Sequence, residues 1–135
     1  CTYSYKIGVI NDVHINTKYN ASKCEVRTAT DEKGQVSKDD FTGYAPLGRY
    51  GCDAPVELTK IMLEKMKQTD PDIDFFLVPG DIPMHGVSMN EKNTSEGNYY
   101  LLLKAIDWFT DAFEEKYPDT NAILAIGNND ALYHN

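Results

Sequence analysis

The sequence predicts an α/β fold organised around a parallel sheet. Three short apolar runs, at residues 5–10, 73–78 and 122–126, have the length and composition of buried strands. Two amphipathic segments separate them, the first from about Pro55 to just before Pro71 and the second from about Tyr99 to Lys116. Helices of this length can cross over between parallel strands, so the order β-α-β-α-β indicates a parallel, right-handed sheet.

Local signals set the bounds of the helices. Asp53, near the cap, and Pro55, in the first turn, mark the start of the first helix. Its core face is expected to consist of Leu58, Ile61, Met62 and Met66. The second helix repeats apolar residues at intervals of three and four, at Tyr99, Leu102, Leu103, Ile106, Phe109 and Phe113. The long polar stretch at residues 11–54 is expected to be a loop that is functional or is held by a covalent cross-link.

Charge and hydropathy argue against several partners. The 135-residue chain has a formal net charge of −8, which is unfavourable for capture of nucleic acid or an anionic membrane. No apolar run approaches the roughly 20 residues that a membrane helix needs, so no transmembrane segment is predicted. A small phosphorylated substrate stays possible, because bound divalent metals can reverse the sign of the local field.

Cysteines and glycosylation motifs point to the secretory route. Cys1, Cys24 and Cys52 show none of the short paired spacings of zinc or redox motifs. Sequons begin at Asn20 and Asn93, and the chain opens on Cys1, from which we expect a removed or omitted N-terminal segment. We therefore predict glycosylation at both asparagines, a Cys24–Cys52 disulfide and a partner for Cys1 outside this chain. The alternative is three unrelated thiols in a cytosolic protein.

Polar residues follow each predicted strand. Asp12 and His14 follow the first, Asp81 the second and Asn128 the third. The carboxyl ends of parallel strands meet at one edge of a sheet, and residues two apart on a strand face the same way. A carboxylate beside an imidazole suits zinc, iron or manganese better than calcium. Each motif alone is common in ordinary loops, but in this order they predict a metal site, in which Asp81 can bridge two cations about 4 Å apart.

These motifs resemble those of the calcineurin-like metallophosphoesterases: Asp12-Val13-His14, Gly80-Asp81 and Gly127-Asn128-Asn129-Asp130. The segments 48–55 and 80–85 narrow the resemblance to the acid sphingomyelinase-like phosphodiesterases and the endopolyphosphatases. The resemblance implies that residues 1–135 are the N-terminal β-α-β-α-β half of a four-layer α-β-β-α sandwich domain. The remainder of that domain would be a missing segment or a separate chain.

The resemblance also implies a role for each site residue. Asp12 and His14 would hold the first metal, Asp81 would bridge, and Asn128 would hold the second. The cofactors would be two divalent ions, usually zinc, and the reaction hydrolysis of a phosphoester or phosphoanhydride by metal-bound hydroxide. His85 matches a catalytic histidine that faces the substrate phosphate, although it could instead be a loop histidine that ties the turn by a hydrogen bond. Residence would be secreted, lysosomal or vacuolar.

Two departures from the family pattern keep alternatives open. Asn129 stands where most of the superfamily has a histidine that assists the leaving group, and an amide cannot donate and regain a proton at neutral pH. In the family, the remaining metal ligands are histidines from the second half of the domain. This sequence does not supply them, since its only histidines are His14, His85 and His134. The leading prediction is a phosphodiesterase whose site is incomplete in this chain. The alternatives are an endopolyphosphatase, or a non-catalytic secreted subunit that kept the scaffold.

Overall fold

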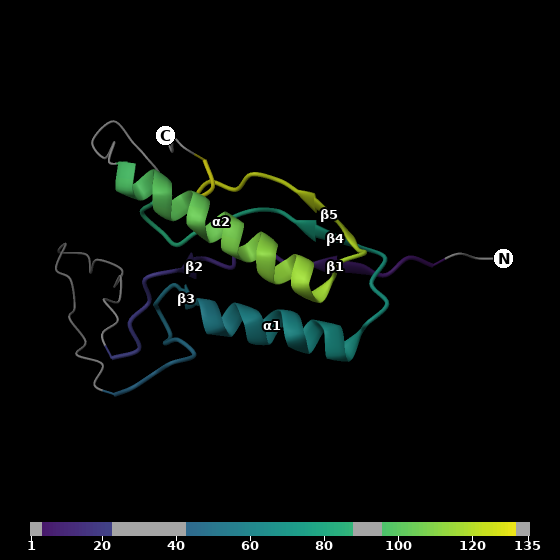
Figure 1. Ribbon diagram of the computed structural model, residues 1–135, viewed down its shortest axis with the longest axis horizontal. Helices are drawn as coiled ribbons and strands as arrows, with labels where there is room; N and C mark the ends of the chain where they lie inside the picture. Colours follow the sequence, from purple (N-terminus) through teal and green to yellow (C-terminus); the bar gives the residue numbers. More distant parts are fainter. Residues whose placement is uncertain (1–3, 23–42, 88–95, 132–135) are drawn as a thin grey trace, which may run out of the picture.

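The computed structural model describes residues 4–22, 43–87 and 96–131, and it confirms the α/β class with a parallel sheet. The main sheet has the order β1-β4-β5, with all pairings parallel, and consists of β1 (Ile7–Val9), β4 (Phe75–Val78) and β5 (Asn121–Leu124). The crossovers contain α1 (Val56–Thr69) and α2 (Glu96–Lys116). Figure 1 shows the two helices running side by side next to the sheet.

A second, very short parallel pair was not predicted. It joins β2 (Ile15–Asn16) to β3 (Ala54–Pro55) across the long polar stretch. Ile15 also forms a parallel bridge with Pro83. Ile15 therefore connects the segment after β1 both to the start of α1 and to the loop after β4, although those regions are far apart in sequence.

The core lies between the helices and one face of the main sheet. Phe76 and Val78 of β4 are buried there, and the helices contribute Leu63, Ala105, Phe109 and Phe113. The predicted core face of α1 is partly wrong, because Leu58 and Ile61 are each 41% exposed whereas Thr59 is buried. Thr59 is polar, so hydrophobic periodicity does not indicate its burial. In α2, Tyr99 and Leu103 are likewise exposed.

The opposite face of the main sheet is apolar and exposed in the part of the chain that the structure describes. Val9, Leu77 and Ile123 are paired in register across the three strands. Val9 and Ile123 are exposed, as is Ile7. Parallel sheets are normally covered on both faces, so this face is suited to a further layer.

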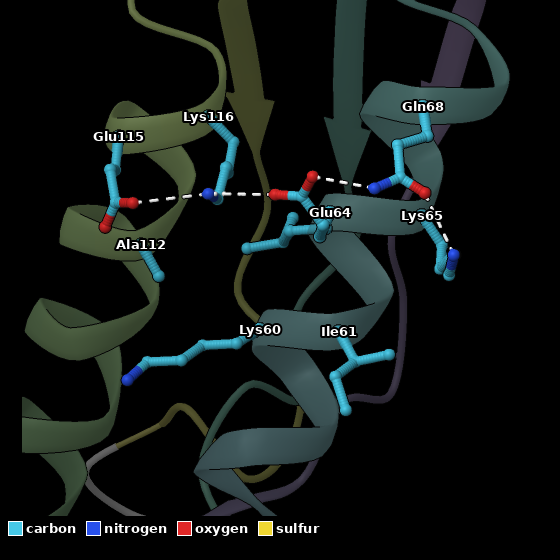
Figure 2. Close-up of a pocket in the computed structure, with 9 residues that line it drawn as sticks. Lys60, Ile61, Glu64, Lys65, Gln68, Ala112, Glu115 and Lys116 are labelled. Atoms are coloured by element: carbon cyan, nitrogen blue, oxygen red, sulfur yellow. Dashed lines mark hydrogen bonds and ion pairs between the residues drawn. The ribbon is translucent and has the colours of Figure 1, made fainter.

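An ion pair joins the two helices near the carboxyl end of α2. Lys116 Nζ lies 2.9 Å from Glu64 Oε2 and 3.3 Å from Glu115 Oε1, as Figure 2 shows. A cavity of about 420 Å³ lies beside this network, and none of the residues that line it is a predicted ligand. Neither described helix combines the length and apolar character needed to cross a bilayer.

Tyr117 at the end of α2 gives a test of the core. The residue is 1% exposed, its hydroxyl has no hydrogen-bond partner among the described residues, and burial raises its pKa. A raised pKa means that stability falls as pH rises above the unfolded tyrosine value of about 10. In Tyr117→Phe we expect the free energy of unfolding to rise by about 1 kcal/mol at pH 7, and the alkaline loss of stability to shrink.

Denaturation of the protein at its natural length, at neutral and alkaline pH, measures both effects. Tyr50→Phe is the matched control, because Tyr50 is 99% exposed and its loss should change neither quantity. A clear loss of stability in Tyr117→Phe at pH 7 would contradict an unpartnered hydroxyl.

Candidate metal centre

The predicted ligands lie on neighbouring loops at the carboxyl edge of the main sheet. Backbone hydrogen bonds hold the loop after β1 against the loop after β4. Asp12 N–H donates to Gly80 O at 3.3 Å, and His14 N–H donates to Asp81 O at 3.1 Å. Ile15 N–H then donates to Ile82 O at 2.6 Å. The two loops therefore run together for several residues, which brings their side chains to one place.

Three of the predicted ligands converge. One ligand atom from each of Asp12, His14 and Asp81 lies within 4.8 Å of the other two. His14 Nε2 is 3.7 Å from Asp12 Oδ1. In a tetrahedral zinc site with bonds of about 2.1 Å, neighbouring ligand atoms lie about 3.4 Å apart. The spacing and the oxygen-nitrogen donor set therefore fit a divalent transition metal.

The imidazole of His14 is oriented for coordination. Its Nδ1 lies 3.3 Å from the carbonyl oxygen of Pro83. A carbonyl oxygen can only accept, so Nδ1 carries the proton and Nε2 presents its lone pair beside Asp12. Metal-binding histidines are commonly oriented by such a backbone carbonyl.

The backbone at these residues is unusual. Asp12, His14 and Asp81 have φ values of 53°, 47° and 55°, and they are the only non-glycine residues with positive φ in the described ranges. The expectation that Asp12 and His14 face the same way because they lie two apart along a strand is therefore wrong, since both lie between β1 and β2 in the left-handed region. This conformation costs about 1–2 kcal/mol per residue and tends to occur at functional sites.

Asp81 is held by the loop after β5. Asn129 donates to Asp81 Oδ1 twice, from its backbone N–H at 2.7 Å and from Nδ2 at 3.1 Å. Burial alone would raise the pKa of Asp81, but these two hydrogen bonds, with His14 and His85 nearby, lower it overall. Asn128 is exposed and lies between Gly127 and Asn129, both of which approach Asp81. Asn129 therefore orients the predicted bridging carboxylate.

Asp130 is a structural residue that the sequence analysis missed. Its carboxylate accepts from Asp81 N–H at 2.6 Å, Ile82 N–H at 2.8 Å and Gly127 N–H at 2.7 Å. Gly80 permits this approach, because a Cβ there would lie 2.2 Å from Gly127 N. The contacts of Asp130 with Asp81 and Ile82 join residues 49 and 48 positions apart, so no local sequence pattern indicates them.

His85 lies beside the three ligands. Its ring stacks on His14 with centroids 4.0 Å apart and planes 20° apart. A cavity of about 510 Å³ is lined by both histidines together with Asp12, Val13, Gly51, Cys52, Asp53 and Ala54. His85 Nδ1 lies 2.6 Å from Asp53 Oδ1. His85 therefore makes a hydrogen bond of the kind expected if it were only a loop histidine. Its ring also lines the cavity, as a catalytic role requires.

Several predicted modification sites fall partly outside the described residues. Cys52 is disulfide-bonded, whereas Cys24, Cys1 and Asn93 lie in undescribed segments, so the Cys24–Cys52 pairing stays a prediction. Asn20 is exposed, and its side-chain oxygen accepts from Ser22 N–H at 2.9 Å. His134 also lies outside the described residues.

Comparison with known proteins gives several phosphodiesterases as relatives. The mouse acid sphingomyelinase-like phosphodiesterase 3b is 31% identical over 121 residues, which is 90% of this chain and 24% of the relative. The mouse cyclic GMP-AMP phosphodiesterase SMPDL3A is 23% identical over 90% of this chain and 25% of its own length. Sphingomyelin phosphodiesterase A of Dictyostelium discoideum is 22% identical over 90% of this chain and 19% of its own length.

No protein-family model matches the chain. The chain spans about a quarter of the length of the mouse relatives. The similarity to the mouse phosphodiesterase 3b covers 90% of this chain. The chain is therefore similar to the acid sphingomyelinase-like phosphodiesterases over about a quarter of their length.

Proposed function

We propose that this chain is part of a metal-dependent phosphodiesterase of the acid sphingomyelinase-like group. The observation that carries the proposal is the convergence of Asp12, His14 and Asp81, each with a left-handed backbone, beside a cavity. Relatives named as phosphodiesterases support the reaction class. The donor set supports metal-assisted hydrolysis of a phosphoester.

In this proposal each residue has a separate task. Asp12 and His14 hold the first cation, Asp81 bridges and Asn128 binds the second. When bound, the two cations, which we propose to be zinc, activate water and offset phosphoryl charge. His85 lines the same cavity, where it can hold the phosphoryl group or pass a proton to the leaving oxygen.

The proposal assigns residues 1–135 to the N-terminal part of one metallophosphoesterase domain. The rest of that domain, as a continuation of the chain or as a separate one, would supply the remaining ligands and a second sheet. The exposed apolar face at Val9 and Ile123 supports the second sheet, because it is suited to packing. We further propose passage through the secretory route, with glycans at Asn20 and Asn93 and a Cys24–Cys52 disulfide.

One observation favours a second candidate, endopolyphosphatase activity. Asn129, which replaces the usual histidine, is buried and bonded to Asp81, so it supports a metal ligand without acting as an acid. The phosphate that leaves in anhydride cleavage needs less protonation than the alcohol that leaves in cleavage of a phosphoester. Release of phosphate from polyphosphate, compared with cleavage of a nucleotide or phosphocholine diester, separates the two activities.

Removal of the metal tests the reaction class. A chelator such as 1,10-phenanthroline should reduce hydrolysis of bis(p-nitrophenyl) phosphate by the natural-length protein to below about 1%, and added Zn²⁺ should restore it. Elemental analysis should find about two metal ions per molecule before chelation. A folded protein that holds no metal and hydrolyses the diester regardless of chelator would contradict the proposal.

A further inference from the structure

We propose that Asp53 is a positioning residue, which fixes His85 so that its Nε2 faces the cavity. The inference deepens the proposed phosphodiesterase function and rests on it. Asp53 accepts two hydrogen bonds from His85, one from the backbone N–H to Oδ2 at 3.0 Å and one from Nδ1 to Oδ1 at 2.6 Å. Both the main chain and the ring of a single residue are therefore held by one carboxylate.

The chemistry of this pair determines which ring nitrogen is available. A carboxylate facing an imidazole nitrogen at 2.6 Å is an acceptor, so His85 Nδ1 carries the proton. Nε2 is then the nitrogen left for another partner. The Asp53 side chain is 18% exposed while that of His85 is 45% exposed, so the carboxylate lies behind the ring and the ring lies toward the opening. Stacking on His14 further restricts the ring.

The backbone explains why Asp53 and His85 meet although 32 residues separate them. Ile15 of β2 pairs with Ala54 on one side and with Pro83 on the other. Hydrogen bonds extend both connections, from Ala54 N–H to His14 O at 2.9 Å and from Met84 N–H to Ile15 O at 3.1 Å. Asp53 directly precedes Ala54, and His85 directly follows Met84. The β2 strand therefore sets the distance between them and places both next to His14.

Asp53 does not cap helix α1. The residue at the N-cap is Pro55, and no side chain makes a cap hydrogen bond there. Asp53 lies two residues before the N-cap, and its carboxylate bonds to His85 instead of the helix; Pro55, expected in the first turn, is itself the N-cap. A lost cap hydrogen bond thus cannot explain an effect of its removal.

A different role for the same residues is metal binding. One atom from each of His14, Asp53 and His85 also lies within 4.8 Å of the others. The direct contact between Asp53 and His85 favours positioning, because their closest atoms already bond to each other. Metal content distinguishes the two roles, since a positioning residue can be removed without loss of an ion.

The test is a double-mutant cycle on the natural-length protein with bis(p-nitrophenyl) phosphate. We expect Asp53→Ala to lower kcat about 10- to 100-fold, as loss of an orienting partner does, with KM within about threefold and metal content unchanged. Asp53→Asn should be intermediate, because it can accept only one of the two bonds. In a His85→Ala background, Asp53→Ala should have no further effect, because the pair acts as a unit.

A matched control addresses a purely structural effect. Glu57 is an acidic residue in the first turn of α1 that pairs with Lys60 across 3.7 Å, and Glu57→Ala should leave kcat unchanged. The ¹⁵N shifts of His85 provide a readout independent of turnover: they should indicate Nδ1–H in the parent and a mixture of tautomers in Asp53→Asn. Asp53→Asn also tests the inference if Asp53→Ala does not fold.

Several results would overturn the inference. They are an unchanged kcat in Asp53→Ala, or a loss of kcat in the Asp53→Ala/His85→Ala double variant that equals the sum of the two single effects. Loss of metal from Asp53→Ala, or a His85 tautomer that is the same in the parent and in Asp53→Asn, would also overturn it. Failure of the phosphodiesterase proposal looks different, since the parent protein would then lack activity while the ¹⁵N shifts still report the bond between Asp53 and His85.

Discussion

Asp81→Asn is expected to lower phosphodiesterase kcat/KM by about a thousandfold or more, because the predicted bridging ligand loses one of its two oxygens and its charge. Asparagine is chosen since it tolerates the left-handed conformation that Asp81 adopts at φ 55°. Loop geometry should therefore survive while metal binding does not. Steady-state kinetics and metal analysis of the natural-length protein measure the two effects.

The matched control for this substitution is Asp72→Asn. Asp72 is exposed and precedes β4, whereas Asp81 follows it, so the same chemical change is made at the opposite edge of the sheet. We expect this control to keep its activity and its metal. An Asp81→Asn protein that binds two ions and retains activity near that of the control would remove the bridging role.

Asp130→Ala is expected to lower the free energy of unfolding by about 3 kcal/mol, because charged hydrogen bonds contribute about 1.5–3 kcal/mol each and are not additive. Three backbone N–H groups, those of Asp81, Ile82 and Gly127, lose their acceptor. Activity should fall as well, since the loop carrying Asp81 would no longer be fixed against the loop carrying Asn128.

Denaturant unfolding at neutral pH measures this loss. Asp119→Ala is the control, because Asp119 is exposed in the turn before β5 and its removal should change stability by less than about 0.5 kcal/mol. Equal stabilities for the two variants would show that the Asp130 carboxylate does not join the two loops.

The regular elements could be predicted because hydrophobic periodicity determines them. The runs at 73–78 and 122–126 correspond to β4 and β5, and the predicted second helix ends at Lys116 as α2 does. The buried face of α1 was harder to predict, because the polar Thr59 is buried whereas the apolar Leu58 is exposed. The β2–β3 pair was missed because two-residue strands have no detectable period.

The predicted ligands could be selected from their position after strands, but their geometry could not. Strand alternation was the wrong reason for expecting Asp12 and His14 together, since a left-handed backbone places them. Asp53 and Asp130 were not assigned to the site because their contacts with His85, Asp81 and Ile82 join residues at least 32 positions apart. Contacts at such separations depend on how the loops cross, which a local pattern does not contain.

The left-handed residues place stability and activity in conflict at this edge of the sheet. Glycine at Asp12 would relieve backbone strain, as the side chain is exposed and its carboxylate accepts only from the neighbouring Asn11 among the hydrogen bonds described. A directed-evolution campaign that rewards heat resistance alone would therefore tend to enrich that change and discard a predicted ligand. Libraries built on this scaffold should retain Asp12 and seek their gains elsewhere.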